Sequence, residues 1–154
     1  ARLIRILQPV HFQGSKHSGG VDVYLDPQLA EAICVDVAVA LQICNDMLAV
    51  ENLAPLGLIV EGHTSASMNG DAESERISGL RALQCARSIQ RGLKAKNPGV
   101  EIIWGKPIEQ AISHKGLGSK VRLPGFEDGG NYVQNRRVEM RLTTPGEPGY
   151  FEGG

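Results

Sequence analysis

The sequence has little of several features that define whole classes of protein. Only three of its 154 residues are cysteine, only 5% are aromatic, and the formal net charge is −1. Three cysteines do not make the disulfide framework of a small secreted domain, and no cysteine or histidine pair has the spacing of a zinc site. The near-neutral charge provides no general attraction to nucleic acid or to anionic lipid.

Long uninterrupted apolar runs are also missing. The most apolar stretch, residues 29–44, contains Glu31, Asp36 and Gln42, which predicts a buried helix and not a membrane span. The three cysteines, Cys34, Cys44 and Cys85, fall among apolar residues. We therefore expect buried, unpaired thiols that behave as small hydrophobic side chains.

What is present fits one globular domain. A hydrophobic share of 42% and a charged share of 21% are ordinary for a chain that buries its own core. No internal repeat or linker divides the sequence. We expect a single domain over residues 1–144 and a disordered tail over residues 145–154.

The first half of the chain predicts two strands around a helix. A strand is expected near Val10 and Phe12. Asp26 followed by Pro27 is a typical helix start, because the side chain caps the first turn and proline suits the first helical position. Apolar residues at spacings of three and four extend this helix to about residue 50. The apolar run at 55–64 suits a central strand of a sheet.

The second half continues the same alternation. A second helix is expected to begin about seven residues after Thr64 and to end at residues 97–99, "NPG". A third strand is predicted at 100–106, a helical turn at 108–113, and a long glycine-rich connection at 114–134. The alternating segment 136–143 predicts a last strand. Two right-handed crossovers would place both helices on one face of a small mixed sheet, which is an α+β fold.

Motifs for catalysis are weak. The segment "GLGSK" at 116–120 lacks the full phosphate-loop spacing and its strand–loop–helix context. Cys85 lies on the apolar face of a predicted helix, so His63 and Cys85 do not make a nucleophile and base. We therefore expect no enzyme activity, no metal site and no cofactor.

One constellation indicates a binding site. A strand ends at His63 and Thr64, and the helix that follows offers free backbone N–H groups at its start. Arg76 and Arg81 lie in the first turns of that helix. Such a groove suits a carboxylate, and we predict Arg81 to be partly exposed at its mouth, near Asn135. The alternative is that Arg76 and Arg81 pair with acids of their own helix as solvated surface charges.

The residues also carry a family resemblance. The segments "IVEGHT" (59–64), "ERISGLRA" (75–82) and "NRRVEMRL" (135–142) resemble the three signature segments of the OmpA-like domain. That domain is the peptidoglycan-associated module of outer-membrane proteins, peptidoglycan-associated lipoproteins and flagellar stator proteins. "PVHFQGS" (9–15) and "WGKP" (104–107) resemble its first strand and a later turn. The resemblance covers about residues 6–143. It implies a two-layer βαβαββ sandwich with a mixed four-stranded sheet and both helices on one face.

The resemblance implies non-catalytic binding of peptidoglycan through the stem peptide. In the family, an aspartate after the His-Thr pair holds the ammonium group of diaminopimelate, and a helix arginine holds a carboxylate of the same group. By position, Arg81 is that arginine, whereas Ser65 replaces the aspartate and supplies no charge. The residues implied as the ligand-binding set are Thr64, Ser65, Asp71, Ser74, Arg76, Arg81, Asn135 and Arg136.

The departures from the family pattern leave two functions open. Ser74 replaces the usual asparagine, the loop before Arg81 is one residue longer, and the 114–134 connection is long. Asp71 is placed either to approach the site or to cap the helix. The first function is peptidoglycan anchoring of an envelope protein, and the alternative is a scaffold or protein-interaction domain that has lost diaminopimelate binding.

The resemblance also implies partners and a location. The expected partner is a diaminopimelate-type peptidoglycan, with membrane attachment through parts of the parent protein outside this chain. A homodimer is an open alternative, and nucleic acid is not an expected partner. The implied location is the periplasm or cell envelope, at the outer membrane or on an inner-membrane-anchored parent, and an organelle is the other location left open.

Overall fold

The structure, a computed structural model, describes residues 8–14, 22–66 and 70–152. Residues 1–7 of the expected domain and 153–154 of the expected tail lie outside this description. Within it, one sheet has the strand order β1-β6-β2-β5. The strands are β1 (Val10–His11), β2 (Gly57–Gly62), β5 (Ser113–Gly116) and β6 (Arg137–Thr143). β6 is antiparallel to both β1 and β2, and β5 is parallel to β2.

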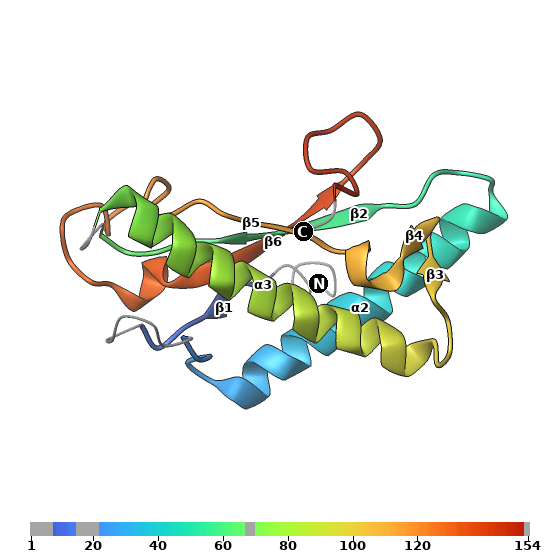
Figure 1. The fold of residues 1–154 in the computed structure, drawn as a ribbon, viewed down its shortest axis with the longest axis horizontal. Helices are drawn as coiled ribbons and strands as arrows, with labels where there is room; N and C mark the ends of the chain where they lie inside the picture. Colours follow the sequence, from blue (N-terminus) through green and yellow to red (C-terminus); the bar gives the residue numbers. More distant parts are fainter. Residues whose placement is uncertain (1–7, 15–21, 67–69, 153–154) are drawn as a thin grey trace.

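Two long helices cover one face of this mixed sheet. They are α2 (Pro27–Val50) and α3 (Asp71–Lys96). Figure 1 shows α3 crossing α2, whose N-terminal end lies below α3 in the view and whose C-terminal end lies above it. The central position of β2, the two crossover helices and the α+β architecture confirm the fold class predicted from the sequence.

Helix α2 begins as the sequence predicts. The Asp26 side chain accepts a hydrogen bond from the backbone N–H of Leu29 at 3.1 Å, and Pro27 occupies the first helical position. By length and composition alone, α2 could cross a membrane, with a mean hydropathy of 1.8. In the structure one of its faces packs in the protein core, through Ala30, Ile33, Cys34, Val37, Ala38 and Leu41.

The core lies between the helices and the sheet. β2 contributes Leu58 and Val60, which are at most 1% exposed. The facing side of α3 contributes Ala82, Cys85, Ala86, Ile89 and Leu93, all with no exposed surface. The alternate residues of β2, Ile59 and Glu61, face the opposite side of the sheet, as the period of a strand requires.

The predicted third strand is partly wrong. Ile102–Ile103 (β3) pairs with Lys106–Pro107 (β4) in a separate two-stranded hairpin and not in the main sheet. A short 3₁₀ helix, η1 (Ile108–Gln110), follows, as the expected helical turn indicates. The main-sheet strand β5 lies at 113–116, at the start of the segment that the sequence predicts as a connection over 114–134. The sequence did not predict this strand because Ser113–Gly116 has no apolar pattern. It is a strand because the fold places it beside β2, where it can pair.

Two glycines bring α3 close to the sheet. A Cβ atom at Gly62, the last residue of β2, would lie 1.9 Å from the backbone oxygen of Ser78. A Cβ at Gly116, the last residue of β5, would lie 2.4 Å from the backbone nitrogen of Gly79. Only glycine permits such an approach. The first turns of α3 therefore sit directly over the ends of β2 and β5.

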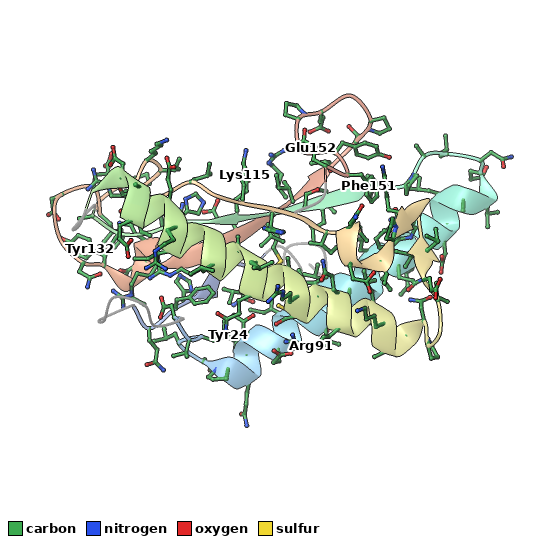
Figure 2. The ribbon with its side chains drawn as sticks, in the orientation of Figure 1. Tyr24, Arg91, Lys115, Tyr132, Phe151 and Glu152 are labelled. Carbon is green, nitrogen blue, oxygen red and sulfur yellow. The ribbon has the colours of Figure 1, made fainter. Side chains whose placement is uncertain are left out.

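The C-terminal segment, for which the sequence predicts a disordered tail, makes tertiary contacts over the described residues 145–152. Tyr150 donates its hydroxyl to the carbonyl of Pro55 at 2.7 Å, and the Phe151 ring packs 6.3 Å from that of Trp104. The backbone N–H of Glu152 donates to Ser113 at 3.1 Å. Figure 2 shows Phe151 and Glu152 at this position beside the sheet. Three tertiary contacts, absent from any local pattern, hold the segment.

Candidate functional site

The candidate site is the corner where β2 ends beneath the start of α3. The backbone continues the sheet past β2: the N–H of His63 donates to the carbonyl of Arg137 at 2.8 Å, and the N–H of Thr64 donates to that of Gly118 at 2.9 Å. His63, Thr64 and Ser65 are therefore fixed between the two neighbouring chain segments, and all three are buried.

Arg81 lies in this corner but not at an open cleft. Its side chain is 3% exposed. The guanidinium contacts the Asp22 carboxylate through two nitrogens, at 2.8 Å from Nε and 2.6 Å from Nη2. A third nitrogen donates to the carbonyl of His63 at 2.7 Å, and the guanidinium lies 5.6 Å from the centre of the Phe12 ring. The expectation of a partly exposed Arg81 is therefore wrong, because a carboxylate from a distant segment covers the guanidinium.

The electrostatics of Arg81 follow from this burial. Removal from water lowers the pKa of the Arg81 guanidinium, and the Asp22 carboxylate opposes that shift. Asp22 is itself held from two sides, since its Oδ1 atom accepts hydrogen bonds from the backbone N–H groups of Gly14 and Val23 at 3.0 and 2.9 Å. The pair is a buried ion pair whose hydrogen-bonding groups are well satisfied.

Ser65 is also bound internally. Its hydroxyl donates to Oδ1 of Asn131 at 2.8 Å. The same Asn131 oxygen accepts a hydrogen bond from Arg136 at 3.0 Å, and Arg136 Nε donates to the carbonyl of Phe12 at 3.2 Å. A neutral amide oxygen thus takes the place beside Ser65 where the resemblance implies a ligand ammonium group.

Asn135 organises the long connection that carries Asn131. Asn135 is fully buried; its side-chain oxygen accepts from the N–H of Leu123 at 2.8 Å, and its nitrogen donates to the carbonyl of Phe126 at 2.8 Å. Figure 2 shows Tyr132 of the same connection at one end of the molecule. Asn135 therefore shapes the loop from within, with both its amide oxygen and its amide nitrogen bound to the loop backbone.

Two buried side chains of the corner lack hydrogen-bond partners among the residues that the structure describes. They are the His63 ring, through both nitrogens, and the Thr64 hydroxyl. Oε1 of Glu139 lies 4.0 Å from Nε2 of the ring. Burial, followed by the positive charge of Arg137, lowers the pKa of His63 to about 4. The ring is therefore neutral at physiological pH.

Three further predicted residues lie in the first turns of α3. Arg76 is exposed and pairs with Glu73 three residues earlier on α3, with Nε 3.0 Å from Oε2. For Arg76, the alternative of a helix-surface ion pair is confirmed. Asp71 is the exposed first residue of α3, and Ser74 is buried against the turn at Gly118.

Of the eight predicted residues, Thr64, Ser65, Arg81 and Arg136 take part in the contacts of this corner. Asn135 and Ser74 are buried beside it, and Asp71 and Arg76 lie on the exposed first turns of α3. The structure adds two residues that the sequence reading missed, Asp22 and Asn131. The sequence does contain an indication for Asp22, because it is an acid between apolar residues in "VDVYLD". That pattern is typical of a buried carboxylate with a partner. The sequence contains none for Asn131, because that residue lies in a polar, glycine-rich stretch.

A metal site finds no support in the described ranges 8–14, 22–66 and 70–152. No group of three or more histidine, cysteine, aspartate or glutamate side chains lies together there in a metal-binding arrangement. What the corner does chemically is hold a carboxylate, through one guanidinium with two nitrogens directed at it.

Comparison with known proteins bears on the fold. No protein-family model matches the chain, and no curated protein matches its sequence. Solved structures do match, and their common architecture is the OmpA-like fold, which this chain has.

Three of these structures are informative. The peptidoglycan-associated lipoprotein of Burkholderia pseudomallei matches with a TM-score of 0.55 and 15% identity, over 88% of this chain and 90% of that protein. The C-terminal domain of Helicobacter pylori MotB matches with a TM-score of 0.57 and 14% identity, over 90% and 86%. The OmpA-like domain of FopA1 from Francisella tularensis matches with a TM-score of 0.51 and 19% identity, over 87% and 70%. At these identities the similarity establishes the fold alone.

Proposed function

We propose that this domain is a non-catalytic, peptidoglycan-associated module of the cell envelope that binds the stem peptide at the Arg81 corner. The observation that carries the proposal is that Arg81 already holds a carboxylate, through contacts of 2.6 and 2.8 Å, at the end of β2 in an OmpA-like fold. The name of one structurally similar protein, the peptidoglycan-associated lipoprotein, is consistent with this role.

Binding requires Asp22 to give way. A stem-peptide carboxylate would replace the Asp22 carboxylate on the same guanidinium, so the ligand competes with an internal partner. Competition with a tethered group weakens binding, because the tethered group is present at high effective concentration. Thr64, whose hydroxyl has no partner among the described residues, would be one further contact for the ligand.

The ammonium end of the ligand would meet neutral groups. Ser65 and Asn131 offer oxygen atoms but no negative charge, and Arg136 lies beside them. A charge-assisted hydrogen bond contributes about 1.5–3 kcal/mol, against about 1 kcal/mol for a neutral one. We therefore expect weaker retention of diaminopimelate than in a domain with an aspartate at this position. Arg76 and Asp71 on the first turns of α3 would contact more distant parts of the peptide, while Ser74 and Asn135 would hold the surrounding loops.

The alternative function is a scaffold or interaction domain that has lost diaminopimelate binding. A specific observation favours it: Arg81 is 3% exposed and is bound to Asp22 on one side and His63 on another. In both cases the proposed location is the periplasm or envelope. Attachment to a membrane through other parts of the parent protein, and formation of a homodimer, stay predictions.

The test is co-sedimentation with purified peptidoglycan sacculi of the diaminopimelate type and of the lysine type. Wild type is compared with Asp22→Asn, which removes the internal competitor, and with Asp46→Asn, a matched loss of one charge on an exposed part of α2. The proposal predicts binding by wild type, stronger binding by Asp22→Asn, an unchanged result for Asp46→Asn, and competition by free diaminopimelate.

Two results would reject the proposal. One is that neither wild type nor Asp22→Asn sediments with either type of sacculus, although circular dichroism shows that the variant is folded. The other is sedimentation that free diaminopimelate does not reduce. Should Asp22→Asn not fold, wild-type sedimentation and its competition by free diaminopimelate decide alone.

A further inference from the structure

Cys34 and Cys85 lie together in the middle of the contact between α2 and α3. Their Sγ atoms are 3.6 Å apart, although 51 residues separate them in the chain. Both side chains have no exposed surface, and both are free thiols. The expectation of buried, unpaired thiols is confirmed for Cys34 and Cys85 and is wrong for Cys44, which is only partly buried. The proximity of Cys34 and Cys85 was not expected.

The helices are held close beside the two thiols. Two turns beyond Cys85, a Cβ atom on Gly92 would lie 2.9 Å from Cβ of Ala38, so the backbones approach closely there. Tyr24, which precedes Cys34 in the chain, hydrogen-bonds through its hydroxyl to that of Ser88 at 2.9 Å, and Figure 2 labels Tyr24 near the start of α2. The sulfur atoms therefore face each other across a tight contact and have little freedom to separate.

We propose that Cys34 and Cys85 are an oxidisable dithiol, which a disulfide oxidant converts into a covalent link between α2 and α3. A disulfide bond is about 2.05 Å long, so the sulfurs must close by about 1.6 Å from their present distance. Side-chain rotation with a small shift of the helices provides that movement. This inference is independent of the proposed binding of peptidoglycan.

The chemistry is thiol–disulfide exchange with a small or protein disulfide, RSSR. The thiolate of one cysteine attacks one sulfur of RSSR, which forms a mixed disulfide and releases the first RS⁻. The second cysteine thiolate then attacks the cysteine sulfur of the mixed disulfide and releases the second RS⁻. Each RS⁻ takes up one of the two protons lost by the cysteines. The protein loses two electrons and two protons, and RSSR becomes two RSH.

The reaction needs a transient opening of the helix pair. The hydrogen bond with Cys34, and then burial, raise the pKa of Cys85 well above its usual range, and only the thiolate is the nucleophile. Oxidation is therefore expected to be slow in the closed structure. Cys44 is a built-in control, because it lies on the same helix as Cys34, is more exposed, and is a free thiol.

The linkage would join the two helices next to the Arg81 corner. Cys85 lies four residues after Arg81 on α3, one helical turn away. Cys34 lies on the helix that follows Asp22 in the chain. We therefore expect the oxidised domain to unfold at a temperature about 5–15 °C higher than the reduced one, because the link closes a long loop in the unfolded chain.

The experiment treats the native, fully reduced protein with oxidised glutathione. The expected product has lost two hydrogen atoms by intact mass, keeps one titratable thiol after denaturation, and yields a Cys34–Cys85 linked peptide on proteolysis. Cys44→Ser should still form the link, whereas Cys34→Ala should not. A free dithiol in the same solution serves as the control for the oxidant. The proposal would be overturned if that dithiol were fully oxidised while wild type kept three titratable thiols, or if the link involved Cys44. If Cys34→Ala does not fold, the peptide map of wild type decides.

Discussion

The buried pair of Asp22 and Arg81 provides a quantitative test of the site. Replacing Asp22 by Asn keeps the size of the side chain and the oxygen that accepts from Gly14 and Val23. It removes the oxygen that faces two guanidinium nitrogens at 2.6 and 2.8 Å. An amide N–H₂ group then faces N–H groups, and the charge of Arg81 stays buried without a counter-ion.

The expected loss is large. Removing one partner of a buried ion pair costs about 3–5 kcal/mol of the free energy of unfolding. The whole free energy of unfolding of a folded domain is only about 5–15 kcal/mol. Arg81→Met should cost a similar amount, because it leaves the Asp22 carboxylate buried and unpaired. The double variant leaves no charge behind, so its loss should be smaller than the sum of the two by about 2 kcal/mol or more.

The measurement is urea unfolding at neutral pH, followed by circular dichroism, for wild type, both single variants and the double variant. At a typical slope, Asp22→Asn should lower the midpoint by roughly 1.5–2.5 M. The matched control is the exposed pair of Glu73 and Arg76, where Glu73→Gln should leave the midpoint unchanged. Additive losses in the double variant would refute the view that Arg81 depends on Asp22.

Three further predictions concern His63, the close packing of α3 on β2, and the C-terminal segment. His63 has a pKa near 6.5 when unfolded and about 4 when folded, so the unfolded state binds the extra proton. Above pH 6.5 His63 should cost no stability, and below it the free energy of unfolding should fall by about 1.4 kcal/mol per pH unit down to about pH 4. Unfolding curves of wild type and His63→Gln at pH 7 and pH 5 measure the difference, and an equal pH dependence of the two would contradict this prediction. Gly62→Ala should cost more than about 2 kcal/mol of the free energy of unfolding, because its Cβ would lie 1.9 Å from the Ser78 carbonyl oxygen. Gly79→Ala, where the added Cβ meets open space, should stabilise the domain by about 0.5–1 kcal/mol. Calorimetric melting compares the two variants, and equal shifts in melting temperature would count against the packing argument. Gly149 packs against Ile59, since a Cβ atom on Gly149 would lie 2.8 Å from Cδ1 of Ile59, which is now 3% exposed. Truncation after Thr144 should therefore uncover Ile59, cost about 1.5–3 kcal/mol of the free energy of unfolding and lower the melting temperature; an unchanged melting temperature would mean that the C-terminal segment does not contribute to stability.

The sequence by itself determined the elements with strong local signals. The capped, periodic helix after Asp26, the apolar central strand at 57–62 and the alternating strand at 137–143 each follow from short-range rules, since their residues are dictated by one buried face. The three family segments place these elements in an OmpA-like fold. The helix-surface pairing of Arg76 with Glu73 was also accessible, because residues three apart on a helix are neighbours.

Only the tertiary structure decided what Arg81 and Ser65 contact. Their partners, Asp22 and Asn131, lie 59 and 66 residues away, and no local pattern connects residues at such separations. The same reason hid strand β5, whose pairing depends on the position of β2, and the contact of Cys34 with Cys85. A side chain's type fixes which contacts it can make, but folding of the whole chain fixes which groups are near enough to make them. For Arg81 that difference separates an open carboxylate site from one that a carboxylate of its own chain already occupies.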